Sequence, residues 1–205
     1  MAEKIDFKKV LDGYRARPSE FRLLRMPATR YLMIDGHGDP NLAPSYTQAL
    51  ETIYPVAYKL KFSSKQNGRD YVVPPLEGLW WADNMESFTT QRDKSQWYWT
   101  LMLMVPDWIT AEEVQAAVLA AVSKRRLPSI DKMRLEELDE GECVQTLHLG
   151  AYDDEGPVLE QMHKDFILGQ GLRLSGKHHE IYLGDPRKVA PERLRTILRQ
   201  PVASL

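Results

Sequence analysis

Two segments of the chain carry the same succession of strands, a glycine and an amphipathic helix. A hairpin is predicted over 21–34 and ends at Gly36, and a second is predicted over 135–149 and ends at Gly150. The buried stripes of the two helices that follow are Tyr46, Ala49, Leu50, Ile53 and Tyr54 in the first, and Leu159, Met162, His163, Phe166 and Ile167 in the second. Because the glycines and the helices keep nearly the same offset, the sequence predicts a duplicated unit.

Each unit is too small to cover its own sheet, so we expect the two to join edge to edge. The prediction is a single α+β domain over 1–205, with an antiparallel sheet, helices on one face and a ligand cleft on the other. Its parts are an N-terminal helical extension at 1–19, a first repeat with an extra helix at 20–125, and a second repeat at 133–205 closed by a C-terminal helix.

Several elements outside the repeat pattern are also predicted. The run from 97 to 105 is aromatic and apolar throughout, which favours a strand covered on both faces. Thr110 and Glu113 form a capping box for the next helix. A last strand is expected at 178–183, followed by a helix with Leu194, Ile197 and Leu198 inward.

Composition excludes several classes of protein. The chain has 205 residues, a net charge of −2 and one cysteine, Cys143, which excludes a disulfide framework and favours a reducing compartment. Both signs of charge are interspersed, unlike the basic stripe of a nucleic-acid binder. No apolar run approaches the roughly 18 residues of a membrane helix, and the charged N-terminus lacks a signal-peptide core. We therefore expect a cytoplasmic protein without nucleic-acid or membrane partners and with oligomeric state undetermined.

Two glutamates are the main catalytic candidates. Strand alternation at 178–183 sends His178, Glu180 and Tyr182 to one face, which we expect to be the groove, with Ile181 facing the helices. Among aromatic rings, Glu180 would serve as a counter-charge for a cation or as a general acid or base. Glu77 is expected in the same cleft, giving a carboxylate pair for hydrolysis. The alternatives are a solvated carboxylate at Glu180 and a surface charge at Glu77.

Aromatic residues concentrate near these glutamates and supply walls for a planar or cationic guest, although part of them is expected in the core. Two methionines share a strand face with Tyr98 and would let a pocket adapt to several shapes. The predicted ligand-binding residues are Trp80, Trp81, Tyr98, Trp99, Met102, Met104, His148, Tyr152 and His178.

Metal and nucleophile sites are not supported by the sequence. Adjacent histidines on a strand point to opposite faces, and the chain has no HxxxH or CxxC pairing. There is no GxSxG motif for a serine nucleophile. We therefore expect neither a metal nor a cofactor.

Five motifs, taken in order, resemble the GyrI-like (gyrase-inhibitor-like) small-molecule-binding domains, and most closely their stand-alone bacterial subgroup. The motifs are YLMIDGHGDPN at 31–41, PPLEGLWW at 74–81, WYWTLM at 97–102, EGECVQTLHLGAYDDE at 140–155 and GKHHEIYLGDPR at 176–187. The resemblance implies a pseudo-twofold pair of β-α-β-β modules with a ligand cleft at their junction. It also implies that Glu180 corresponds to the buried glutamate that meets cationic drugs in related multidrug-responsive regulators.

The resemblance further bears on activity, since some stand-alone GyrI-like proteins are hydrolases that open the cyclopropane of DNA-alkylating cyclopropanoid compounds. Glu77, Trp80, Glu180 and Tyr182 fall in motifs of that subgroup, so catalytic roles are expected for Glu77, Glu180 and Tyr182. The segment before the first predicted strand is too short to hold the helix-turn-helix domain of the related regulators, so we do not expect a transcription-factor role. The alternative is a non-catalytic protein that sequesters drugs or acts on gyrase or another protein partner.

Overall fold

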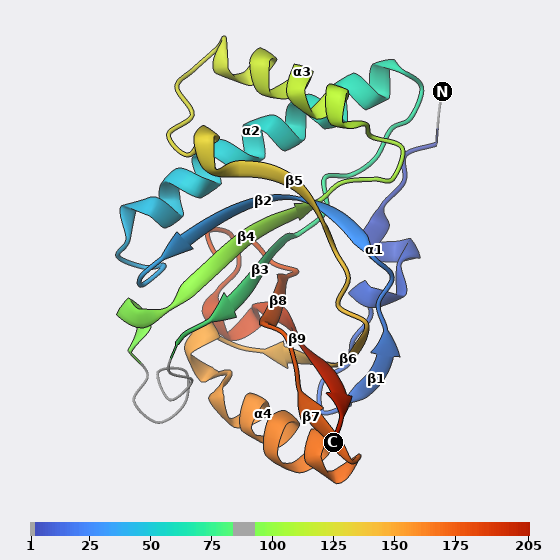
Figure 1. Cartoon of the computed structure of the whole chain (residues 1–205), viewed down its shortest axis with the longest axis vertical. Coiled ribbons are helices and arrows are strands. Elements are labelled where there is room, and N and C mark those ends of the chain that lie inside the picture. Colours follow the sequence, from blue (N-terminus) through green and yellow to red (C-terminus); the bar gives the residue numbers. More distant parts are fainter. Residues whose placement is uncertain (1–2, 84–92) are drawn as a thin grey trace.

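The computed structural model describes residues 3–83 and 93–205, and within them nine strands form one sheet. The strand order is β1-β6-β9-β8-β3-β4-β2-β5, with the short β7 pairing to β9 (Figure 1), and every strand pairing is antiparallel. The strands are β1 (Arg22–Arg25), β2 (Thr29–His37), β3 (Leu76–Trp81), β4 (Tyr98–Met104), β5 (Met133–Leu138), β6 (Glu142–Leu149), β7 (Leu172–Leu174), β8 (His178–Tyr182) and β9 (Arg195–Ser204). The predicted α+β class with an antiparallel sheet is confirmed, while the internal duplication stays a prediction.

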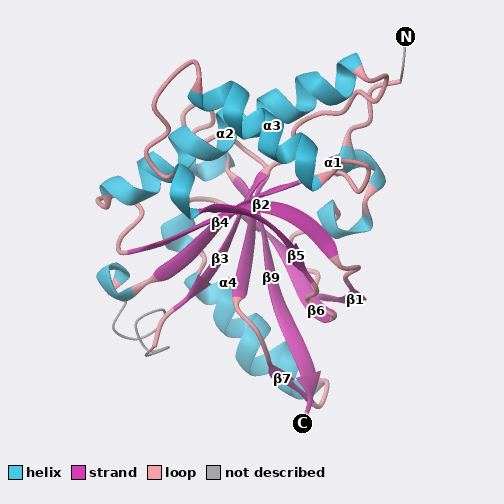
Figure 2. Ribbon diagram, turned by 45° about the horizontal axis from the view of Figure 1, so that its top comes forward, coloured by secondary structure: helices cyan, strands magenta, loops and turns pink. Residues whose placement is uncertain are grey.

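The helices lie in two groups over the sheet (Figure 2). Helix α2 (Pro44–Gln66) packs beside α3 (Ala111–Val122), and α4 (Gly156–Glu160) continues into a π-helical segment, Gln161–Ile167, at the other end of the sheet. The predicted capping box of α3 is confirmed: Thr110 accepts from the Glu113 backbone and Glu113 from the Thr110 backbone. No helix in the described ranges is both long and apolar enough to cross a membrane.

Both helical groups cover the same face of the sheet. Leu101 and Leu103 of β4 pack under α2, against Ile53 and its neighbours. Val144 of β6 packs under the π-helical segment. The register of the pairings from β2 through β6 places all of these strand residues on one side, which we call the helical face.

The opposite face is partly covered by the N-terminal segment. Helix α1 (Phe7–Val10) and the 3-10 turn Asp12–Tyr14 lie there, with Phe7 packing against Tyr71 and Trp108. The expected helical extension at 1–19 is thus reduced to two short turns. We call this side the far face.

Both predicted hairpins are wrong, because their strands exchange partners. Strand β1 pairs with β6, and β2 pairs with β5 and β4, so neither predicted partner is used. The connection after β1 does not turn back, since the backbone N–H of Met26 extends the β1–β6 ladder by donating to Gly141. Alternation and turn residues predict strands and their ends, but they carry no information on which distant strand lies alongside.

The predicted C-terminal helix is also wrong, because 195–204 forms the central strand β9. Leu194, Ile197 and Leu198 have helical spacing, yet β9 is paired on both sides and is buried on both faces, which removes the alternation that distinguishes a strand. A short apolar run of this kind fits either element. The predicted strand at 178–183 is confirmed as β8, although it is not the last one.

Candidate functional site

A large cleft lies on the helical face, between α2 and α4, where β3 meets β8. Its volume is about 2010 Å³, above the range of about 300 to 1,000 Å³ common for small-ligand pockets. The floor carries Trp80, Glu180 and Tyr182, and one wall carries Tyr46 and Tyr54 of α2. The prediction that helices and cleft occupy opposite faces is wrong, because two separated helical groups leave the middle of their own face open. Ile181 accordingly packs on the far face and not under helices.

Strand register brings the floor residues together. Gly78 of β3 lies opposite Glu180 of β8, and Trp80 lies opposite His178, so these positions share the helical face. A Cβ atom at position 78 would come within 2.9 Å of the Trp80 indole nitrogen and 3.2 Å of the Tyr182 hydroxyl. Glycine at this position therefore leaves the space in which Trp80 and Tyr182 meet.

A chain of hydrogen bonds ends on Glu180. The Trp80 indole N–H donates to the Tyr182 hydroxyl at 2.9 Å, and that hydroxyl donates to Oε2 of Glu180 at 2.7 Å. Burial, reinforced by the charge of Glu180, raises the pKa of Tyr182 well above its usual value. Tyr182 therefore keeps its proton at neutral pH, and the indole and the phenol together fix one oxygen of the carboxylate.

Aromatic rings line the cleft around this carboxylate. Tyr46 stacks on Trp80 with ring centroids 6.3 Å apart, and Trp97 meets Trp80 edge-on at 5.8 Å. Tyr152, in the 3-10 turn before α4, meets Tyr182 edge-on at 5.4 Å. Such rings present flat faces to a planar guest and negative π-clouds to a cation.

Two histidines lie at one side of Glu180. His178 is 8% exposed, and its Nε2 is 3.5 Å from Oε1 of Glu180. His163, in the π-helical segment, lies with its ring centroid 6.3 Å from that of His178, and both line the cleft. Burial, together with the neighbouring His178, lowers the pKa of His163 to about 4, so His163 is neutral at pH 7.

Glu77 does not share the cleft with Glu180, so the predicted carboxylate pair is wrong. It lies opposite Ile181, one residue out of register with Glu180, and its side chain is therefore on the far face. There it is 1% exposed and accepts from the Tyr14 hydroxyl at 2.6 Å, with His179 Nε2 at 2.9 Å from its other oxygen. Its catalytic role stays untested, but it has no access to the same guest.

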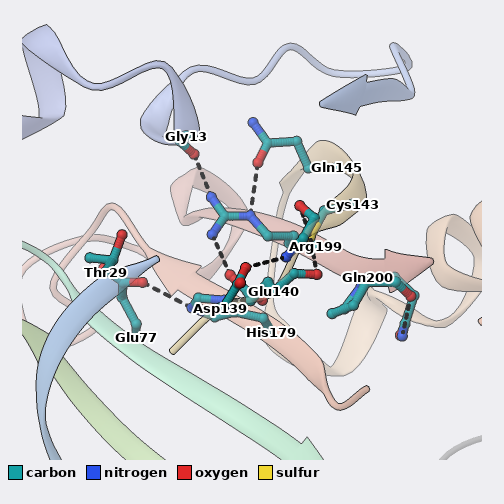
Figure 3. Close-up of polar contacts among 12 residues, drawn as sticks. Gly13, Thr29, Glu77, Asp139, Glu140, Cys143, Gln145, His179, Arg199 and Gln200 are labelled. Carbon is teal, nitrogen blue, oxygen red and sulfur yellow. Dashed lines mark hydrogen bonds and ion pairs between the residues drawn. The ribbon is translucent and has the colours of Figure 1, made fainter. Parts of the chain in front are cut away.

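Glu77 belongs to a buried network that we call the far-face network, shown in Figure 3. His179 lies between Glu77 and Glu140, whose Oε1 is 2.9 Å from Nδ1. Arg199 of β9 then donates to the second Glu140 oxygen at 3.1 Å and to the Gly13 backbone carbonyl at 2.7 Å. The network joins β3, β8 and β9 to each other and to the N-terminal segment.

The charged groups of this network shift one another's pKa values toward the ionised forms. Burial alone would lower the pKa of His179, but the Glu140 charge and the two carboxylate contacts outweigh it and raise that pKa to about 8. Burial alone would raise the pKa of Glu140, whereas His179 and Arg199 lower it to about 2. At neutral pH the network holds an imidazolium between two carboxylates.

Of the predicted ligand-binding residues, Trp80, Tyr152 and His178 line the cleft and the rest do not. Trp99 is fully buried under Tyr46. Trp81 and Tyr98 stack on each other on the far face, at 5.7 Å, with the Lys177 ammonium 3.3 Å from the Trp81 ring. Those outside the cleft are Trp81, Tyr98, Trp99, Met102, Met104 and His148.

The other predicted residues outside the cleft, two methionines and one histidine, are held elsewhere by their own contacts. Met102 and Met104 face Phe7 and Tyr71 in the apolar cluster of the far face. His148 is buried on β6, with Nε2 3.0 Å from the Ala151 carbonyl oxygen. The prediction placed the methionines and Glu180 in one cleft, whereas the strand register puts them on opposite faces of the sheet.

Sequence reasoning missed cleft residues on the helices. The helical spacing predicts that Tyr46 and Tyr54 lie in the buried stripe of one helix and His163 in that of another, yet each lines the cleft. Glu155, 5% exposed, also lines it. The available signal was chemical: tyrosine and histidine carry a polar tip on an apolar body, which suits the wall of a pocket. Among the residues placed by the structure, no three histidine, cysteine, aspartate or glutamate side chains are grouped as metal ligands.

Comparison with known proteins assigns the family. The model of the GyrI-like small molecule binding domain matches residues 19–203. An uncharacterized conserved protein from Listeria innocua is 38% identical, with a TM-score of 0.88 over 98% of this chain and 100% of the other. A protein from Listeria innocua described as a hydrolase is 37% identical, with a TM-score of 0.83 over the same shares of the two chains.

More distant structures share the fold only. The C-terminal domain of EcmrR is 13% identical, with a TM-score of 0.55 over 91% of this chain and 98% of that domain. No curated protein matches the sequence significantly. The family match over most of the chain, together with the cleft on the helical face, shows that this protein belongs to the GyrI-like small-molecule-binding domain family.

Proposed function

We propose that the cleft binds a flat aromatic molecule, preferably a cation, with Glu180 as the counter-charge. The observation that carries the proposal is the chain from Trp80 through Tyr182 to Glu180, which fixes a 14% exposed carboxylate between aromatic walls. A carboxylate that is mostly removed from water needs a compensating partner, and an organic cation held by ring faces supplies one.

We further propose that the bound molecule is hydrolysed. Proteins 37% identical over 98% of this chain are described as hydrolases, which supports this reaction class. The substrate class we propose is a cyclopropanoid DNA-alkylating compound, whose flat conjugated rings fit the aromatic walls. Its ring strain supplies driving force, so acid–base assistance of about 10² to 10⁴-fold would suffice. The role would be cytoplasmic self-protection without nucleic-acid contacts.

In the proposed reaction, Glu180 accepts a proton from water, and the water oxygen forms a bond to a cyclopropane carbon. The strained C–C bond breaks, and its electron pair moves through the conjugated system to the carbonyl oxygen. That oxygen takes the proton and becomes a phenol, which regenerates the Glu180 carboxylate. Tyr182 keeps Glu180 oriented toward the water, and the product is the substrate plus one water.

The direct test is to incubate the protein with a cyclopropanoid alkylator in ¹⁸O-labelled water and follow the ring-opened adduct by mass spectrometry. Glu180→Gln should abolish the enzymatic adduct while a neutral substrate still binds. Glu142→Gln, at an exposed position of β6, is the matched control and should keep wild-type turnover. An adduct that forms no faster than in buffer would refute the hydrolase proposal.

Binding without turnover is the second candidate. The hydrogen bond from Tyr182 holds one oxygen of Glu180, as a fixed counter-charge for sequestering a cation would require. Recovery of unchanged ligand from a tight complex would favour this function, and Glu180→Gln should then lower the affinity for cations.

A further inference from the structure

The cleft contains three buried ring nitrogens without a hydrogen-bond partner in the described part of the chain. They are Nδ1 and Nε2 of His178 and Nε2 of His163; Nε2 of His178 lies 3.5 Å from Oε1 of Glu180, an ion-pair contact that does not form a hydrogen bond. A buried polar atom without a hydrogen-bond partner lowers the stability of the folded state, and most buried polar atoms in proteins have such a partner. Three of them on two neighbouring rings, all in one cleft, indicate a place where a guest supplies the missing hydrogen bonds.

The backbone presents these rings to the cleft from two elements. His178 lies on β8, two residues from Glu180 on the same face, and is more than nine-tenths buried. His163 lies in the π-helical segment, where i→i+5 bonding brings Met162 and Ile167 together on the sheet side. His163 follows Met162 and is thereby turned toward the cleft. Segments of this kind are frequent at functional sites.

The charge state of the pair determines which group it would bind. His163 is neutral at pH 7 because burial and His178 lower its pKa to about 4. A neutral imidazole offers one N–H donor and one acceptor nitrogen. Glu180 already supplies the negative charge of the site, so the histidines add hydrogen-bonding capacity beside it.

We propose that His163 and His178 form a subsite that selects flat aromatic cations carrying an amine, hydroxyl or amide group on their edge. This inference rests on the proposed function, since it needs the guest to stack in the cleft with its charge near Glu180. The rings of Tyr46 and Trp80 hold the flat face, while the two histidines bind the polar edge. A guest without that edge group leaves the buried nitrogens unpaired and binds more weakly.

The test compares two cationic dyes built on the same three-ring acridine system. Proflavine carries two edge amines, and 10-methylacridinium carries none. We expect proflavine to bind the wild type about tenfold more tightly, as a hydrogen bond to a buried partner allows. The affinity ratio should fall to about one in the variant that combines His163→Leu with His178→Leu. His37→Leu, which alters a histidine that stacks on Tyr98 outside the cleft, should leave the ratio unchanged.

A second measurement needs no variant. The imidazole ¹⁵N signals of His163 and His178 should shift on addition of proflavine and stay in place with 10-methylacridinium. Equal affinity of the wild type for the two dyes, or identical ¹⁵N responses, would overturn the histidine subsite and leave the proposed function intact. Failure of both dyes to bind would overturn the proposed function and the subsite with it.

Discussion

Replacement of Glu77 by glutamine should destabilise the protein while sparing the cleft. The substitution keeps the shape of the side chain but removes its charge. Glu77 accepts from Tyr14 at 2.6 Å and lies 2.9 Å from Nε2 of the fully buried His179. After substitution, the imidazolium loses one of its two carboxylate partners, and the tie between β3 and the N-terminal segment is weakened.

The size of the effect follows from the burial of the pair. Removing one partner of a buried ion pair costs about 3 to 5 kcal/mol. For a chain of this length each kcal/mol lowers Tm by about 2 to 4 °C, so Glu77→Gln should lower Tm by roughly 6 to 20 °C. Glu180→Gln should cost at most about 1.5 kcal/mol, because that carboxylate has one strong hydrogen bond and partial access to solvent.

Thermal unfolding followed by circular dichroism measures the Tm of each variant. Titration with proflavine, well below the unfolding transition, measures the affinity of the cleft. The two variants should give opposite profiles: Glu77→Gln a lower Tm with unchanged dye affinity, Glu180→Gln a similar Tm with weakened affinity. Glu77→Gln with a wild-type Tm and lost binding or turnover would refute the separation of the two faces.

Three further outcomes follow from the geometry. Because the pKa of His179 is raised to about 8, its contribution to the stability of the fold is complete below pH 6.5 and is lost as pH rises through 8. The free energy of unfolding in urea should therefore fall between pH 6 and pH 9 by about 2 kcal/mol more in the wild type than in His179→Gln. Gly36→Ala should lower Tm by several degrees in a thermal melt, because the new Cβ would lie 2.0 Å from the fully buried Trp99 ring. Tyr182→Phe should cost about 1 to 3 kcal/mol in urea unfolding, since the Trp80 N–H is left unpaired, and less than that when Trp80→Phe is also present.

The elements of this fold could be predicted where a local pattern is complete. The strand at 98–104 and the capped α3 follow from an aromatic and apolar run and from the capping pair at Thr110. The partners of β1 could not be predicted, because its ladder with β6 joins positions far apart in the sequence. Strand β9 could not be distinguished from a helix, since both of its faces are buried.

The candidate site was predictable only along single strands. Alternation within β8 correctly grouped His178, Glu180 and Tyr182, because the period of two is a property of the strand itself. The relation of Glu77 to that group depends on the register between β3 and β8, and a shift of one residue reverses the face. Which face is open depends in turn on where the helices pack, and the sequence of the strands does not contain that information.

The central strands serve two purposes because their side chains alternate. On β8, His179 enters the far-face network while its neighbours His178 and Glu180 enter the cleft. On β3, Glu77 and Trp80 divide in the same way. The buried charges on the far face hold β3, β8 and β9 in register, and that register determines the distance between Tyr182 and Trp80 on the helical face. Loss of the far-face network should therefore disturb the cleft through backbone position, and only after the stability of the sheet itself has fallen.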